Sequence, residues 1–232
     1  MNRSTLPIWS LLLALSALWL LADTLLPAPF TYFSFRAAFV QYTGTIGMGL
    51  MSAAMLLAAR PRWLVRPLGG LGPLYRLHKW LGIVGMGFAL LHWWWAQGTK
   101  WMVGWGWLSR PAKGPPSGET LPLLAQWLRG QRGLAESVGE WAFYAAVLLT
   151  VLALIRSVPA RWFRKTHNWL ATAYLVLVYH TLVLVKPGYW SQPVGWVLAA
   201  LLVAGTASAV LLLAGRAGRA RALPAGSRAL TA

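Results

Sequence analysis

The chain has 232 residues, of which 58% are hydrophobic and only 11% are charged. This balance excludes an ordinary soluble globular protein and is typical of an integral membrane protein. The sequence contains no cysteine, which excludes disulfides, iron–sulfur clusters and thiolate metal sites. Any metal must therefore be held by histidine, methionine or oxygen ligands.

Six apolar stretches approach or reach the roughly 20 residues that a helix needs to cross a bilayer. The first follows a basic residue, as a secretory signal would, but no small-residue cleavage site closes it, and we interpret it as a retained helix. We predict an all-α fold, a six-helix transmembrane bundle over residues 1–215, followed by a basic, disordered cytoplasmic tail over 216–232. The predicted spans are 8–28, 40–59, 78–97, 141–156, 168–185 and 194–215.

The net charge of +17 would suggest nucleic-acid binding in a soluble protein, but its distribution matters more here. Basic residues concentrate at the N-terminus, in the loops at 60–79 and 156–165 and in the tail. All four acidic residues fall on the other side, Asp23 near the outer end of the first span and three in the connection after the third. The positive-inside rule therefore predicts a multi-pass protein of the cell (inner) membrane with both termini cytoplasmic. The basic excess then serves topology and contact with anionic lipid, and we expect no nucleic-acid partner.

All four histidines fall within or beside two of the predicted spans. His78 and His92 are separated by fourteen positions in the third span, and His167 and His180 by thirteen positions in the fifth. At about 1.5 Å per residue, each pair is separated by roughly 20 Å along its helix, so one member lies near each face of the membrane. Because the two spans run in the same direction, we predict that His78 is level with His167 on the cytoplasmic side and His92 with His180 on the outer side.

Two facing imidazoles at each level can supply both axial ligands of a haem held between the helices. We therefore predict two b-type haems and electron transfer across the membrane. A non-haem metal is less well supported, since each level offers two histidines and no carboxylate or thiolate nearby. Ordinary structural histidines, or a haem-free transporter or scaffold whose histidines relay protons, remain alternatives. A proton relay usually needs embedded carboxylates, and the sequence offers only Asp23.

The spacing also predicts how the rings point. Fourteen positions at about 100° each end roughly 40° short of four turns, so the two histidines of the third span share a face. Gly82 and Gly85 are predicted to let flat macrocycles approach the backbone there. Thirteen positions end about 140° short of four turns, so a π-bulge, a bend or different ring rotamers must align the fifth-span pair. We predict a helix irregularity between Ala171 and Val178.

Basic residues flank both histidine levels and are candidates for neutralising haem propionates. They also anchor the ends of the helices in the positive-inside sense, and the two roles are compatible. On the outer side the candidates are Lys100 and Lys186. On the inner side they are Arg76, Lys79, Arg164 and Lys165.

The paired histidines, in the contexts LHKWLG (77–82) and FRKTH (163–167), resemble the ferric reductase-like transmembrane family. This family includes NADPH oxidases, iron reductases and a bacterial haem subunit that feeds periplasmic methionine sulfoxide reductase. The resemblance covers roughly residues 40–215, and the segment 30–44 further resembles the membrane half of bacterial ferric reductase-like flavoproteins. It implies six helices, two haems on the four histidines, and an oxidoreductase component.

In oxidases and reductases of the family, a flavin domain and a nicotinamide domain follow the last helix. This sequence has no glycine-rich dinucleotide fingerprint after a predicted strand, so FAD or FMN is expected only through a partner or a missing domain. The predicted donor is a cytoplasmic flavoprotein reductase or a quinol. The acceptor is ferric iron, oxygen or a periplasmic redox partner, and a haem-binding subunit of a methionine sulfoxide reductase system is the closest alternative function.

Overall fold

The computed structural model describes residues 6–109, 123–155 and 159–215, except for the side chains of 160–165. Within these ranges every element of regular secondary structure is a helix, which confirms the predicted all-α class. The predicted tail over 216–232 lies outside the described residues. The elements are α1 (Leu6–Ala22), α2 (Tyr32–Ala58), α3 (Arg62–Val65), α4 (Leu71–Gly104), α5 (Leu123–Leu154), α6 (Ala160–Leu184), the 3-10 helix η1 (Pro187–Ser191) and α7 (Pro193–Leu213).

Six of the described helices are long, and each overlaps one predicted span. Two of them extend well beyond the predicted spans 78–97 and 141–156, since α4 has 34 residues and α5 has 32. The prolines between α4 and α5 all lie before Leu123. No proline occurs from Leu123 to the end of α5, so the helix continues without interruption. At the start of α2, Thr31 and Ser34 form a capping box that satisfies free backbone N–H groups.

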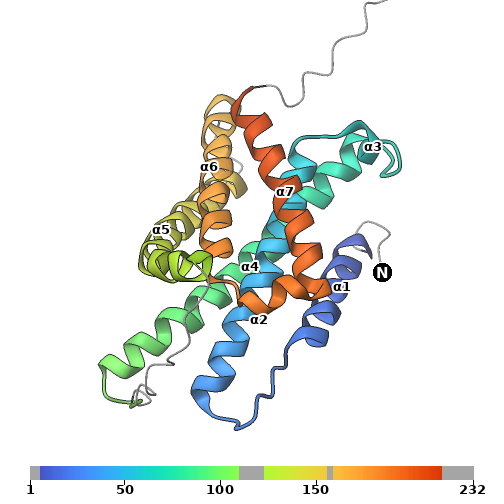
Figure 1. Ribbon diagram of the computed structural model, residues 1–232. Helices are drawn as coiled ribbons and strands as arrows, with labels where there is room; N and C mark the ends of the chain where they lie inside the picture. The colour runs from blue at the N-terminus through green and yellow to red at the C-terminus, as the bar shows by residue number, and fades with distance from the viewer. Residues whose placement is uncertain (1–5, 110–122, 156–158, 216–232) are drawn as a thin grey trace, which may run out of the picture.

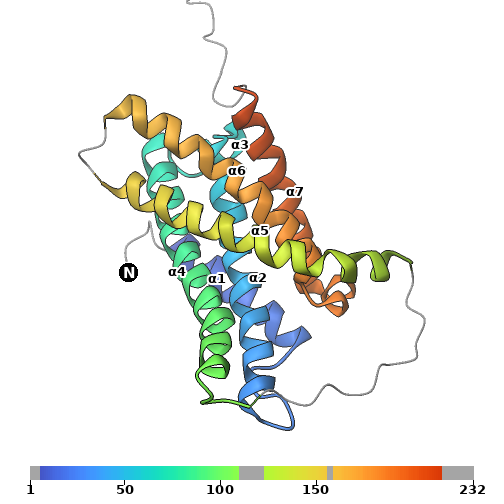
Figure 2. The same cartoon turned by 90° about the vertical axis from the view of Figure 1, so that its left-hand side faces the viewer.

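The long helices pack as two antiparallel pairs, α2 with α4 and α5 with α6. The two pairs cross obliquely, and α7 packs against both α2 and α6 (Figures 1 and 2). Helix α3 and the start of α4 lie at one end of the molecule together with the end of α7, and the end of α4 lies at the other (Figure 1). Residues of α2, α4, α5 and α6 line one cavity between these pairs.

Glycine lets α2 and α4 approach closely at their midpoints. A methyl group on Gly85 of α4 would lie 3.2 Å from the side chain of Met51, and one on Gly47 of α2 would lie 3.4 Å from Cβ of Phe88. The contact at Gly85 is tighter than ordinary van der Waals packing and the contact at Gly47 lies at its short limit, so a larger residue at Gly85 would require Met51 to shift. Gly85, predicted to face a macrocycle, thus packs against α2.

The surface of the helices is apolar. Leu21 of α1, Leu148 of α5 and Val203 of α7 are 75%, 60% and 70% exposed, an arrangement that is unfavourable in water and favourable in lipid. Helices α5 and α7 are each long and apolar enough to cross a membrane, and α1 is an apolar helix of 17 residues. These features are those of a membrane protein.

Candidate functional site

The four histidines of α4 and α6 meet in two pairs, with the partners that their spacing predicts. The ring centroids of His78 and His167 are 5.8 Å apart, with an interplanar angle of 71°. Those of His92 and His180 are 6.2 Å apart, at 82°. We call these the inner pair and the outer pair.

The separations fit two imidazoles bound to one metal from opposite sides. A metal–imidazole bond is about 2 Å long and the bonding nitrogen lies about 1.1 Å from the ring centre, so trans ligands place their centroids roughly 6.2 Å apart. Within the described ranges no group of three or more His, Cys, Asp or Glu residues could hold a metal ion. A porphyrin brings four nitrogens of its own and needs only the two ligands that each pair supplies.

Backbone carbonyls on neighbouring helices orient three of the four rings. A carbonyl can only accept a hydrogen bond, so the contacting Nδ1 carries the proton and Nε2 keeps its lone pair for a metal. This is the tautomer that an Nε2 ligand requires. The contacts are His78 Nδ1 to Ala54 O (2.9 Å), His92 Nδ1 to Val40 O (2.9 Å) and His180 Nδ1 to Ala135 O (2.8 Å).

Helix α2 supports both levels with one repeated contact. The interval from Val40 to Ala54 equals that from His78 to His92, and the antiparallel pairing of α2 with α4 brings each ring to its carbonyl. Sequence reasoning missed these partners because a carbonyl is present at every residue. Which two carbonyls of α2 face the histidines depends on the rotation of α2 about its axis, and helix packing determines that rotation.

Two further glycines make room for the outer pair. A methyl group on Gly139 of α5 would overlap the His180 ring, with Cγ only 2.7 Å from the added carbon. One on Gly44 of α2 would lie 3.0 Å from Cε1 and Nδ1 of His92. The sequence offered no signal for either glycine, because neither lies on a histidine-bearing helix.

The predicted irregularity between Ala171 and Val178 is wrong. Residues Ala160–Leu184 form one α-helix without a π turn, and both pairs still meet although the interval between the histidines is shorter on α6 than on α4. The oblique crossing in Figure 2 supplies the reason, since the direction from α6 to α4 changes along α6. Both histidines of α6 therefore reach the histidines of α4 without a break in the helix.

The outer pair opens into a cavity of about 220 Å³. Arg36 of α2 lines this cavity and donates hydrogen bonds to the carbonyls of Trp95 (3.2 Å) and Ala96 (3.1 Å) and to the hydroxyl of Thr99 (2.9 Å). All three acceptors are neutral, and no ion pair of Arg36 with a carboxylate is found in the part of the chain that the structure describes. Glu136 and Glu140 line the same cavity, and Arg36 is one of three cations there that a haem propionate could meet.

The comparison with protein families agrees with this geometry. A family model described as "Ferric reductase like transmembrane component" matches residues 43–178, which is more than half of the chain. The chain belongs to this family. No curated protein matches it. The matched range contains three of the four histidines, and His180 lies two residues beyond its end. Membership in the ferric reductase-like family points to transmembrane electron transfer and to haem as the cofactor class.

The remaining inner candidates are only partly described. Arg76 and Lys79 are exposed on the first turns of α4, near the half-buried ring of His78. The side chains of Arg164 and Lys165 lie outside the described residues. Nothing in the described chain comes within 4 Å of a methyl group on Gly82, so its surroundings leave room for a bulky group.

On the outer side, the two lysines predicted to serve propionates differ. Lys100 lines the outer cavity. Lys186 forms an ion pair with Asp23 at 2.8 Å, so its ammonium is already engaged by a carboxylate of the protein. Arg36, which the sequence-based prediction omitted, is better placed than Lys186 to meet an anion in the cavity. Arg36 lies just before the predicted second span, and nothing in the sequence there indicated a role at the outer cavity.

Proposed function

We propose that the protein carries electrons across a membrane through two b-type haems, one at each histidine pair. The observation that carries this proposal is the separation of the ring centroids, 5.8 Å and 6.2 Å, in two pairs on the same two helices. The carbonyl contacts that leave Nε2 of three rings available for a metal support it further. Family membership supports the reaction class.

Each histidine pair has its own role in this proposal. His78 and His167 hold the inner haem, and His92 and His180 hold the outer one. Bound haem would supply one-electron exchange between ferric and ferrous iron, and ligation by two histidines would leave no open position for oxygen or another ligand. Two centres separated by roughly 20 Å along the helices divide the apolar barrier into shorter electron-transfer steps. Arg36 balances the charge of an outer propionate.

The orientation of the protein in the membrane follows from the charges at its two ends. Arg60, Arg62 and Arg66 lie around α3, beside the start of α4, which supports placing the inner pair on the cytoplasmic side. The protein is then a multi-pass protein of the cell membrane with both termini in the cytoplasm. Electrons enter from a cytoplasmic flavoprotein reductase or a quinol and leave at the outer pair to an external acceptor.

A liposome assay tests the proposal directly. The haem-loaded protein is reconstituted into vesicles that contain ferricyanide, and a membrane-impermeant reductant is added outside. We expect ferricyanide reduction that depends on the protein and falls to the background of empty vesicles for His92→Ala, because the variant lacks one step of the path. Equal rates for the wild type and His92→Ala would contradict the proposal. A wild type that incorporates no haem would favour the transporter or scaffold alternative.

A further inference from the structure

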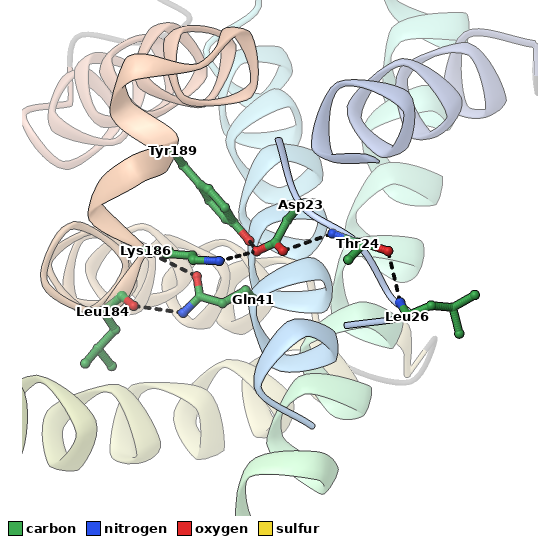
Figure 3. Close-up of polar contacts among 7 residues, drawn as sticks. All are labelled: Asp23, Thr24, Leu26, Gln41, Leu184, Lys186 and Tyr189. Atoms are coloured by element: carbon green, nitrogen blue, oxygen red, sulfur yellow. Dashed lines mark hydrogen bonds and ion pairs between the residues drawn. The ribbon is translucent and has the colours of Figure 1, made fainter. Parts of the chain in front are cut away.

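A network of polar side chains ties the outer end of α6 to α1 and α2 (Figure 3). Asp23, directly after α1, accepts hydrogen bonds from Nζ of Lys186 (2.8 Å), from the hydroxyl of Tyr189 (2.6 Å) and from the N–H of Thr24 (2.9 Å). The side chain of Asp23 is 14% exposed, and Tyr189 is 2% exposed. The carboxylate is thus enclosed mainly by donors from a segment far away in the sequence.

Gln41 of α2 extends this network to the backbone at the end of α6. Its Nε2 donates to the carbonyl of Leu184, the last residue of the helix, at 3.0 Å. Its Oε1 accepts from the backbone N–H of Lys186 at 3.0 Å. One side chain thereby satisfies a free carbonyl at the helix end and the first donor beyond the C-cap, which fixes the end of α6 against α2 (Figure 3).

The position of Gln41 links this contact to the outer histidines. Its neighbour Val40 provides the carbonyl that orients His92, and Lys186 follows His180 by less than two helical turns of sequence. Gln41 and Leu184 both line the outer cavity. Two consecutive residues of α2 therefore act on the outer pair. Val40 orients His92 directly, and Gln41 holds the end of the helix that bears His180.

We propose that Gln41 is a positioning residue of the outer haem site, and that the contacts of Asp23 with Lys186 and Tyr189 hold the same segment after α6 in place. It fixes the end of α6 and with it the separation and orientation of His180 relative to His92. The quality of axial ligation at the outer haem, and hence its redox midpoint, depends on this contact. The inference rests on the proposed function, because it assigns a role to these residues only if haem binds between the outer rings.

Apolar packing holds the same region independently of the network, so variants of the network are expected to fold. Trp19 is fully buried, with its ring centroid 5.1 Å from that of Tyr42 and 6.4 Å from that of Tyr189. Val194 and Leu198 of α7 belong to the same buried cluster. Removing the amide of Gln41 leaves these contacts in place.

The experiment compares Gln41→Leu and Lys186→Met with two controls in the haem-loaded, full-length protein. Lys186→Arg keeps a cation that can pair with Asp23. Ser191→Ala removes a hydroxyl of η1 that bonds only locally, to the carbonyl of Gly188, and does not touch the network. The readouts are the electron paramagnetic resonance spectrum and a redox titration of both haems, with the outer signals identified as those lost in His92→Ala.

We expect Gln41→Leu and Lys186→Met to move the g values and the midpoint of the outer haem and to introduce a high-spin fraction there. The inner haem should keep its wild-type signals, and both controls should match the wild type. Unchanged outer signals in the two variants, or equal changes at both haems, would overturn the inference. The proposed function fails separately, through a wild type without haem.

Discussion

The inner and outer histidine pairs have the same ligands but very different surroundings. The inner pair adjoins a cluster of buried leucines from α2 and α4, including Leu57, Leu77 and Leu81. The outer pair opens into a cavity in which, among the described lining residues, cations outnumber carboxylates. A haem potential depends on nearby charge and on burial as well as on the axial ligands. We therefore expect the two haems to have different potentials.

Removal of a ligand gives the largest expected effect and tests whether the two levels are separate sites. His92→Ala should lose the outer haem and keep the inner one, and His78→Ala should do the reverse, because each haem needs both axial imidazoles of its own level. The haem content per chain and the redox titration measure this. If either variant lost both haems, the two levels would form one cooperative unit and would not be separate sites.

A methyl group beside His180 should damage the outer level alone. Gly139→Ala places a carbon in steric overlap with the His180 ring, so the ring must move and the outer haem should bind weakly or with a high-spin fraction. Gly130→Ala is the matched control on the same helix, because nothing lies within 4 Å of its added carbon. The absorption spectra of the reduced proteins compare the two. A wild-type outer haem in Gly139→Ala would contradict the structural role given to this glycine.

Removal of the cavity cation should change the potential of the outer haem without removing the haem. A positive charge favours the reduced state, so Arg36→Leu should lower the outer midpoint, by roughly tens of millivolts, and leave the inner midpoint unchanged. Arg36→Lys keeps the charge and should lie close to the wild type. A spectroelectrochemical titration measures both midpoints. A raised or unchanged outer midpoint in Arg36→Leu would show that the charge of Arg36 does not set the potential of the outer haem.

The smallest effect is expected at Asp23, whose network belongs to the outer level only. Burial opposes ionisation of this carboxyl, but hydrogen bonds from Lys186, Tyr189 and Thr24 outweigh it and hold its pKa below the usual value of 3.8. Burial and the contact with Asp23 raise the pKa of the Tyr189 hydroxyl, which therefore remains a donor at neutral pH. A carboxyl with a lowered pKa in the folded state stabilises the protein above the unfolded pKa, and this contribution is lost as pH falls through the folded value.

Asp23→Asn should therefore cost on the order of 1 kcal/mol at neutral pH, since Lys186 is largely exposed and solvent weakens the pair. The difference in melting temperature between the wild type and Asp23→Asn should stay constant from about pH 5 to 8 and shrink below about pH 4. Thermal unfolding in detergent at several pH values measures it. A difference that varied between pH 6 and 8 would show that another group controls the network.

Local periodicity was enough to predict the all-α class, the approximate helix positions and the pairing of the histidines by depth. These properties depend on the spacing of residues along one helix, as for His78 and His92. The contacts that distinguish the outer level could not be predicted in this way. The carbonyl of Val40, the space at Gly139 and the pairing of Asp23 with Lys186 depend on how helices rotate and cross. The same crossing aligns the two histidines of α6 without the predicted break in that helix.

Quantitation of haem in the purified protein tests the central claim most directly. A pyridine haemochrome assay of protein produced with sufficient haem, combined with the paramagnetic resonance spectrum of the oxidised form, gives the number and spin state of the haems. We predict two b-type haems per chain, both low-spin with two imidazole ligands. One haem per chain, no haem, or a mainly high-spin wild type would contradict the account.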